Sequence, residues 1–459
     1  MKKLFLSLAI ALGIVGCEKF LDVPPVNKLL EQEALTSPAD YERLLNSCYD
    51  VTANYYNGRI QNLFELLGDN LSAPNNNSDY TEVYNRNMLF FNSTIGGVYG
   101  EPYISIFRIN KLLERIDEIG FDPDRRIEIE AEARFLRAMG HFELVRGWAQ
   151  PYGFTANNTH PGITIKGSTE AQLLPRNSVE EVYAFIIQDL KFAENNLSGT
   201  NGVYATSWAA KALLAKVYFQ MNDYNNATLY AAEVINSGEF DFGSSTDRFV
   251  QNAVANEAIF STISVSDPEG GNNDFRSGAL VGNYRSDVGG EPTLRASKEY
   301  YDLIAGDTAD ARSAWVEVRN PGQANEYYAI TKFNKEYFNV PVLHLTDMKL
   351  IRAESLCLLN RDKDVAIEDL NDILERAFGN SDRNLSLNNN YNEILEAVRR
   401  ERRIEMLGEG DRVQDLKRRG AAGESILIRN SDWNCPGLIL QFPVTERSDV
   451  FEMNQTGGC

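Results

Sequence analysis

Two segments of the chain repeat one helix–turn–helix design. Residues 214–235 (LAKVYFQMNDYNNATLYAAEVI) have apolar side chains at helical spacing on both sides of a polar turn near Asn222. Residues 351–374 (IRAESLCLLNRDKDVAIEDLNDIL) follow the same plan with one extra residue. Small residues, which let two helices approach closely, occupy matching places in the two segments: Ala215, Ala227, Ala353 and Ala366. This pattern favours stacked, tetratricopeptide-like helix pairs.

Two further helix pairs have looser patterns. A helix is predicted to begin with a capping Asp122 and Pro123 and to run to about Ala149. Its partner would begin at Ser178, which forms a capping-box pattern with Glu181. The first pair would combine residues 38–51 with 103–119. The sequence therefore predicts a mainly α fold with four helix pairs over 37–51, 103–149, 178–235 and 347–378.

Long, loop-rich insertions separate these pairs. The stretch 72–87 is rich in Asn, and the stretch 266–292 is dense in Gly, Asn and Asp. A few short strands are predicted, over 259–265, 315–318 and 327–333. We expect one domain over 37–459, with insertions at about 52–102 and 240–340 and a C-terminal segment over 379–459.

The start of the chain is typical of an export signal. Two lysines precede an apolar run over 4–15, which is too short to span a bilayer. The run ends in Ile14-Val15-Gly16-Cys17, which resembles a bacterial lipobox, in which the cysteine takes a lipid. The resemblance implies a signal peptide over 1–16, lipidation at Cys17 and a lipid-anchored tether over 17–36.

Charge and motif content argue against several functions. The formal net charge of −20 repels phosphate backbones, so nucleic acid is not an expected partner. The three histidines, His141, His160 and His344, share no metal-ligand spacing, and no nucleophile elbow or phosphate-binding loop occurs. We therefore expect no metal and no cofactor. Acidic pairs are abundant, so a hydrolase stays an open alternative.

The remaining cysteines fall into two groups. Cys48 and Cys357 lie on apolar helix faces and are expected to be buried thiols. Cys435 and Cys459 flank the last segment, where a disulfide would hold an otherwise loose tail. Sequence does not fix the connectivity, so this pairing stays a possibility.

The run Arg399–Arg403 has interspersed acids and is interpreted as a salt-bridged helix rather than an anion site. It belongs to a set of segments that resemble the SusD/RagB family of outer-membrane lipoproteins of Bacteroidetes. These segments occur in the family's order and cover nearly the whole chain: residues 17–25 (CEKFLDVPP), 131–153, 341–360, 398–418 (VRRERRIEMLGEGDRVQDLKR) and 442–454. Two features depart from the family pattern, namely His344 in place of a more usual Arg and the ending NQTGGC.

The resemblance implies a non-enzymatic nutrient-binding lipoprotein on the outer face of the outer membrane. Members act as a lid over a TonB-dependent transporter of the SusC type and deliver an oligosaccharide or polysaccharide to it. By analogy, the helix pairs would face the transporter and the insertions would form the ligand face. Three alternatives stay open: a peptide cargo as in the RagB branch, a hydrolase, and a repeat scaffold that binds only proteins.

Sugar binding needs flat aromatic faces together with planar polar side chains. Candidates are the aromatic and polar residues within the polar insertions: Tyr80, Tyr84, Asn87, Phe275, Tyr284, Arg285 and Trp315. Trp148 and Trp208 lie on predicted helices and are expected in the core. Each candidate could instead anchor its own loop, so the sequence alone does not choose between these roles.

Overall fold

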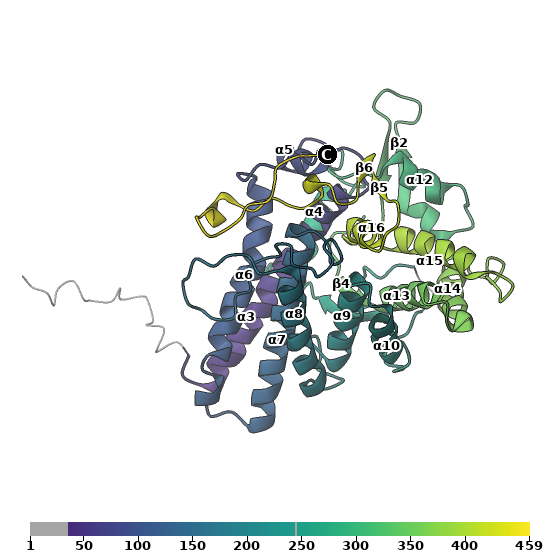
Figure 1. Cartoon of the computed structure of the whole chain (residues 1–459). Coiled ribbons are helices and arrows are strands. Elements are labelled where there is room, and N and C mark those ends of the chain that lie inside the picture. Colours follow the sequence, from purple (N-terminus) through teal and green to yellow (C-terminus); the bar gives the residue numbers. More distant parts are fainter. Residues whose placement is uncertain (1–34, 244–245) are drawn as a thin grey trace, which may run out of the picture.

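Helices dominate the part of the chain that the computed structural model describes, residues 35–243 and 246–459 (Figure 1). The expected signal peptide, Cys17 and nearly all of the expected tether lie outside the described residues. Within the described ranges, no helix is both long and apolar enough to cross a membrane.

Eight helices pack as four pairs: α3 (Pro38–Tyr56) on α6 (Ser93–Leu113), α7 (Pro123–Trp148) on α8 (Val179–Asn196), α9 (Ser207–Gln220) on α10 (Tyr224–Ile235), and α13 (Leu345–Leu358) on α14 (Lys363–Phe378). Contacts of α6 with α7, α8 with α9 and α10 with α13 join the pairs into one row. The predicted mainly helical fold is confirmed. The small residues Ala215, Ala227, Ala353 and Ala366 are all buried, as their role in close helix approach requires.

Capping residues explain why some boundaries were predictable. The Asp122 side chain accepts a hydrogen bond from the N–H of Asp124 at the start of α7, and Ser178 and Glu181 form the expected capping box of α8. Helix α6, in contrast, begins at Ser93 and not at Tyr103. Its glycines and Pro102 favoured a loop, but the buried residues of this stretch hold it as a helix.

The two insertions pack against each other above the helix row in Figure 1. The first contains α4 (Arg59–Leu67) and α5 (Ser78–Tyr84), and the second contains α11 (Gly278–Tyr284) and α12 (Lys298–Ala305). A bridge joins Leu71 to Ala296, and the N–H of Asn75 donates to the carbonyl of Thr293 at 2.8 Å. Gly58 has a positive φ of 114°, and a Cβ there would lie 2.4 Å from the nitrogen of Leu280, so only glycine fits this contact.

Short strands complete the second insertion. Strand β1 (Ala258–Thr262) pairs antiparallel with β4 (Val340–His344), and β2 (Val316–Arg319) pairs with β3 (Tyr327–Ile330) after the 3-10 turn η3 (Ala311–Trp315). The three predicted strands are confirmed: β1 and β3 are shorter than predicted, and β2 is shifted by one residue. Strand β4 lies just before the helix pair predicted over 347–378, and it was not predicted. His344 ends that strand and caps α13, accepting a hydrogen bond from the N–H of Asp347.

The C-terminal segment returns across the molecule. After α15 (Tyr391–Glu405) and α16 (Arg412–Ala421) come the short elements β5 (Leu427–Ile428), β6 (Ser431–Asp432), η4 (Pro436–Leu438) and η5 (Val444–Glu446). The indole N–H of Trp148 on α7 donates to the carbonyl of Gln441 at 3.1 Å. Cys435 and Cys459 form a disulfide with a Cα–Cα distance of 5.7 Å.

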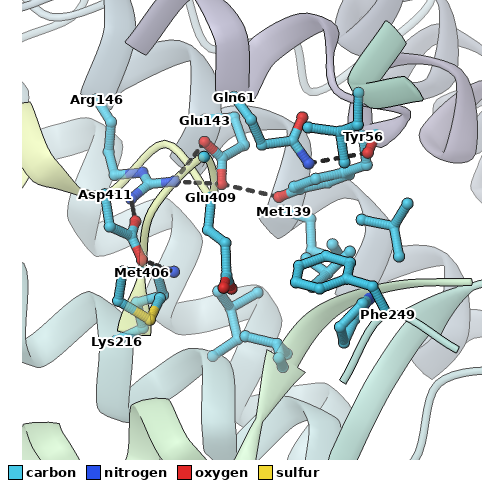
Figure 2. Close-up of a pocket in the computed structure, with 17 residues that line it drawn as sticks. Tyr56, Gln61, Met139, Glu143, Arg146, Lys216, Phe249, Met406, Glu409 and Asp411 are labelled. Atoms are coloured by element: carbon cyan, nitrogen blue, oxygen red, sulfur yellow. Dashed lines mark hydrogen bonds and ion pairs between the residues drawn. The ribbon is translucent and has the colours of Figure 1, made fainter. Parts of the chain in front are cut away.

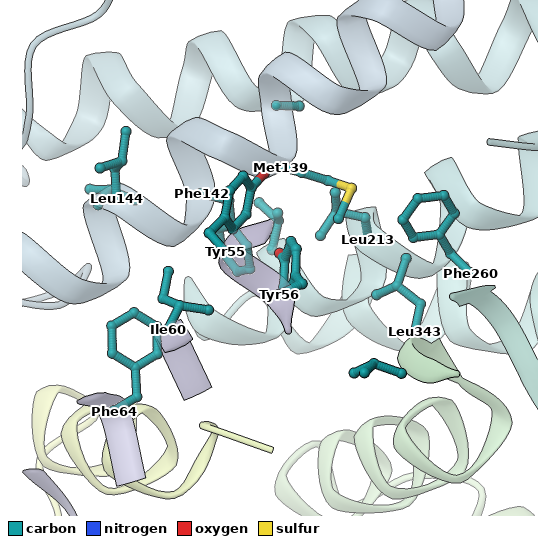
Figure 3. Close-up of a cluster of buried hydrophobic side chains, with 14 of the residues drawn as sticks. Tyr55, Tyr56, Ile60, Phe64, Met139, Phe142, Leu144, Leu213, Phe260 and Leu343 are labelled. Atoms are coloured by element: carbon teal, nitrogen blue, oxygen red, sulfur yellow. The ribbon is translucent and has the colours of Figure 1, made fainter. Parts of the chain in front are cut away.

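One large hydrophobic core joins the helix row to the insertions (Figure 3). Tyr55 and Phe64 enter it from α3 and α4, Phe142 from α7, and Phe260 and Leu343 from the strands. A smaller core lies among α13, α14 and α15. The free thiols of Cys48 and Cys357 are buried as predicted, and burial raises the pKa of each to about 12.

Candidate functional site

Three of the predicted ligand-contact residues lie in the core. Tyr80 and Tyr284 are buried, and only 8% of Trp315 is exposed. The hydroxyl of Tyr80 accepts a hydrogen bond from the amide of Asn62 at 3.4 Å, and the ring of Tyr284 packs against Phe333. The expectation that these rings project from polar loops is therefore wrong, because other residues of the insertions pack over them. None of these three residues therefore presents an exposed ring face to a ligand.

The other four predicted residues reach the surface, at separate places. The Arg429 guanidinium lies 4.0 Å from the ring centre of Tyr84, and Asn87 is exposed. Phe275 is half-buried and stacks on Tyr337, with ring centres 4.2 Å apart. Arg285 pairs with Asp287 at 2.7 Å. The structure does not bring these side chains together into one pocket.

A group of ionisable residues is buried between the helix row and the insertions (Figure 2). Arg146 on α7 pairs with Asp411 at 2.7 Å and with Glu143 at 2.6 Å. Lys216 on α9 donates to the second oxygen of Asp411 at 2.6 Å, and the hydroxyl of Tyr56 donates to Glu143 at 2.8 Å. Each charge thus has an oppositely charged partner, on the same helix or on another element, as burial of a charge requires.

A second buried group centres on Glu405 at the end of α15. Arg248, Arg312 and Arg376 all pair with its carboxylate. Burial alone would raise the pKa of Glu405, but these three guanidinium groups hold the pKa well below its usual value. The cavity beside Arg146 and Glu409 has a volume of about 30 Å³. Ligand pockets have volumes of about 300–1,000 Å³, so the cavity beside Arg146 has no room for a sugar ring. The buried charges therefore have a structural role, because they join the helix row to the insertions.

The histidines have structural surroundings. His141 is fully buried beside the carbonyl of Arg137, and burial lowers the pKa of its imidazole to about 3. His344 Nε2 lies 3.0 Å from the carboxylate of Glu409 inside the charge network. Among residues 35–243 and 246–459, no group of three or more His, Cys, Asp or Glu side chains could hold a metal ion.

An open surface groove lies where the α8–α9 loop meets α3 and β1. Two adjoining hollows of about 340 and 220 Å³ share Tyr204 and Phe260 in their walls, and we call them together the Tyr204 groove. Tyr204 is 39% exposed, and its ring meets Tyr49 edge to face at 4.9 Å. Trp208, at the start of α9, is half-buried and lines the larger hollow. Two aromatic rings thus reach one open groove.

The loop that carries Tyr204 is held in place by the scaffold. The N–H of Ala205 donates to the hydroxyl of Tyr49 at 3.0 Å, and the Asn201 amide donates to the carbonyl of Ala205 at 3.0 Å. Lys211 lies 4.9 Å from the ring centre of Trp208 and pairs with Glu233 at 2.7 Å. These contacts fix the aromatic rings before any ligand arrives, which lowers the entropic cost of binding.

Polar groups line the smaller hollow of the groove. Arg276 pairs with Asp50 and Asp274 and donates to the amide oxygen of Asn54 at 2.9 Å. The buried hydroxyl of Thr262 has no hydrogen-bond partner among the described residues. The groove therefore combines ring faces with planar hydrogen-bonding groups, the chemistry that sugar hydroxyls and C–H faces require.

Two family models match the chain. One, described as starch-binding and associating with the outer membrane, matches residues 19–219, and the SusD family model matches residues 172–430. The second match alone spans more than half of the chain. The chain belongs to the SusD/RagB family.

Other SusD-like proteins resemble the chain along most of its length. A SusD-like protein of Formosa agariphila is 26% identical over 475 aligned residues, which cover 90% of each chain. A SusD superfamily structure from Bacteroides vulgatus superposes with a TM-score of 0.79 at 22% identity, covering 91% of this chain and 99% of the other. A SusD-like carbohydrate binding protein of the same species gives a TM-score of 0.70 at 18% identity, covering 84% of each chain.

Segment 398–418, which resembles a motif of the SusD/RagB family, contributes Glu405 and Asp411 to the two buried charge groups. Its arginines pair mostly with other elements: Arg399 with Glu354 at 3.1 Å, and Arg402 with Asp347 at 2.6 Å. The prediction of a salt-bridged structural helix is therefore confirmed. Arg399 and Arg400 also pair with Glu396 and Glu401 on the helix itself, but most of the bridges join the helix to its neighbours. Segment 398–418 therefore has a structural role, because its ion pairs join α15 to α13.

Sequence reasoning missed the main residues of the Tyr204 groove. Trp148 is buried as expected, but Trp208 is not, although both were assigned to the core. Tyr204 follows a turn-forming stretch, Gly199–Val203, between two helices. The rule that selected aromatic residues in polar loops would have found it, had it been applied to the short loops as well as to the long insertions.

Proposed function

We propose that this SusD/RagB protein captures an oligosaccharide at the cell surface and delivers it to a partner TonB-dependent, SusC-like transporter. The family model for residues 19–219 is described as starch-binding and associating with the outer membrane, which supports a glycan cargo and this location. The similar structure from Bacteroides vulgatus that is named a SusD-like carbohydrate binding protein supports the same cargo class.

The observation that carries the glycan assignment is the Tyr204 groove. A pyranose ring packs its C–H face on an aromatic ring, while amide, carboxylate and guanidinium groups bond its hydroxyls. Tyr204 and Trp208 supply the rings, and Asp50 and Arg276 supply the polar groups. The predicted residues that reach the surface, Tyr84, Asn87, Phe275 and Arg285, are a second candidate surface.

Lipid attachment at Cys17 completes the proposal. The apolar run and Gly16-Cys17 junction support acylation there, followed by a tether that leads to α3. With an anchor of this kind, the helix row would sit over a transporter in the same membrane, facing the exterior. The family description supports association with the outer membrane.

Affinity electrophoresis in gels containing starch, xylan, mannan or β-glucan tests the glycan assignment. The wild-type chain should be retarded by one of them, and Trp208→Ala should weaken the interaction at least tenfold, a loss of about 1.4 kcal/mol, because it removes a stacking surface. Trp433→Ala is the matched control, since Trp433 lies outside the groove and is also only half-buried.

Two outcomes would count against this proposal. If Trp208→Ala and Tyr204→Ala both bind as wild type while Tyr84→Ala or Phe275→Ala loses binding, the site is the surface of the insertions and not the groove. If no polysaccharide retards the chain and mixed tripeptides bind to it in calorimetry, the cargo is a peptide, as in the RagB branch.

A further inference from the structure

A second open hollow lies along α6 and shares no lining residue with the Tyr204 groove. Its volume is about 410 Å³, and we call it the α6 cleft. Its walls come from α6, from the loop 164–172 and from the C-terminal residues 443–446. No predicted site residue lies in it, and neither the fold nor the buried charge network accounts for its chemistry.

Three aromatic residues of α6 line this cleft. Tyr99 and Tyr103 form the inner part, with ring centres 5.1 Å apart, and the hydroxyl of Tyr103 donates to the carbonyl of Thr164 at 2.9 Å. Phe107 stands at the edge with 52% of its surface exposed. Next to these rings α6 has glycines, and a Cβ at Gly100 would meet no atom within 4 Å. The bare backbone therefore opens onto the cleft.

One carboxylate of the cleft, that of Glu446, has no partner among the described residues. Glu446 is half-buried, and its side chain forms no hydrogen bond or ion pair with any residue in the described ranges. Burial raises the pKa of Glu446, while the positive charge of Lys166 opposes that rise. A half-buried carboxylate without a partner is costly, so its retention in a cleft favours a cationic ligand.

The other charges of the cleft have partners of their own. The ammonium of Lys166 donates to the carbonyl of Gln172 at 3.3 Å, and Glu170 accepts a hydrogen bond from the Gln172 amide. Lys166 influences Glu446 only through its charge, since no ion pair within 4 Å joins these two described residues. With two carboxylates and one ammonium, the cleft is net negative, and so is the chain as a whole at −20.

We propose that the α6 cleft binds a primary ammonium group, with Glu446 as its counter-ion and the rings of α6 packing on the body that carries it. A cation beside aromatic faces gains cation–π attraction in addition to the ion pair. Given the glycan cargo on which this assignment rests, the ligand is an oligosaccharide with a free amino group, of the glucosamine type. The site is distinct from the Tyr204 groove.

Calorimetry on the mature chain with three matched trisaccharides tests this proposal. β-1,4-linked glucosamine trimer, its fully N-acetylated form and cellotriose differ only in an ammonium, an acetamide or a hydroxyl at position 2. The glucosamine trimer should bind at least tenfold more tightly than the other two at neutral pH. The preference should weaken as the pH falls, because Glu446 becomes protonated.

Three variants localise the effect. Glu446→Gln should abolish the preference for the amine, whereas Glu452→Gln, an exposed acid of the same segment outside the cleft, should retain it. Gly100→Leu should block the cleft without destabilising α6, because Leu favours a helix and the site has space for its Cβ.

Equal affinity for the three trisaccharides would overturn the proposal, as would an unchanged preference in Glu446→Gln. If a Gly-Lys-Gly peptide binds in a Glu446-dependent way and the glucosamine trimer does not, the amino-sugar assignment is wrong. The glycan assignment of the Tyr204 groove has a separate test, affinity electrophoresis with neutral polysaccharides and the Trp208→Ala variant. A negative result there can therefore be distinguished from a negative result for the α6 cleft.

Discussion

Buried carboxyl groups in this protein differ according to whether a cation faces them. Glu354 lies beside Arg418 and Arg399, and although burial opposes this, these neighbours lower its pKa to about 2. Glu65 on α4 forms no ion pair with any described residue, and its Oε1 accepts one hydrogen bond, from the N–H of Gly410 at 3.0 Å. Burial raises the pKa of Glu65 to about 8, so it is protonated near neutral pH.

The protonation of Glu65 predicts a pH-dependent stability. Between its ordinary pKa of 4.5 and about 8 the folded state binds a proton that the unfolded state releases, so its contribution to stability is lost as the pH rises. Glu65→Gln removes this titration and can still accept from Gly410. The free energy of unfolding of the variant relative to wild type should therefore increase by up to about 1.4 kcal/mol per pH unit over this range.

Urea unfolding at intervals from pH 4.5 to 8.5 measures this difference. Glu396→Gln is the control, because the Glu396 side chain is 73% exposed and its substitution should give a constant offset. A difference between Glu65→Gln and wild type that does not change with pH would contradict the assigned protonation of Glu65.

At the scale of the element, α15 packs on α13 and α14 of the helix row, and an ion pair joins it to α16. Arg402 projects from α15 into the interior and pairs with Asp347 at 2.6 Å and with Asp415 at 2.7 Å. Two residues earlier, Arg400 has a side chain 41% exposed and pairs with the adjacent Glu401. One helix thus carries a buried arginine and an exposed arginine close together.

Replacing these two arginines should have very different effects. Arg402→Met leaves buried carboxylates without a counter-charge and should lower the free energy of unfolding by about 3–5 kcal/mol. Arg400→Met removes a partly exposed pair and should cost less than about 1 kcal/mol. Chemical denaturation of both variants measures the contrast, and equal losses would show that the buried network does not stabilise the fold.

The elements that were predictable from sequence are those with local signals. The helix pairs could be predicted from the caps at Asp122 and Ser178 and from the paired alanines. Capping hydrogen bonds and close helix packing each depend on a few neighbouring residues, so they leave a local pattern in the sequence. The extension of α6 through Pro102 was missed, since its helical state depends on packing against distant elements. Tyr284 was misplaced for the same reason, because the residues that bury it come from other segments.

At the scale of the whole molecule, the disulfide closes a loop across 24 positions that carries one wall of the α6 cleft. The double variant Cys435→Ser, Cys459→Ser removes a constraint worth roughly 3 kcal/mol in the unfolded chain. Amides over 440–456 should then exchange hydrogen faster, and the α6 cleft should bind its amine less tightly, because Glu446 is held by this loop.

Hydrogen exchange followed by mass spectrometry measures the effect, with α9 and α10 as internal references that should not change. Cys357→Ala serves as the matched control, since this free thiol lies in the smaller core among α13, α14 and α15. Wild-type exchange rates over 440–456 in the double variant would show that the tail is held by its packing alone.

The bond between Gly410 and Glu65 joins positions 345 residues apart, and Asp411 neutralises charges on helices made much earlier in synthesis. Because a chain emerges with its N-terminal part first, Arg146 has only Glu143 of its own helix as a partner, and Lys216 has neither Asp347 nor Asp411, until these later residues have been made. The early helices therefore bury a lysine and an arginine whose charges are fully balanced only after the later segments have been made. The helix row can therefore complete its buried ion pairs only after residues 410 and 411 have been synthesised.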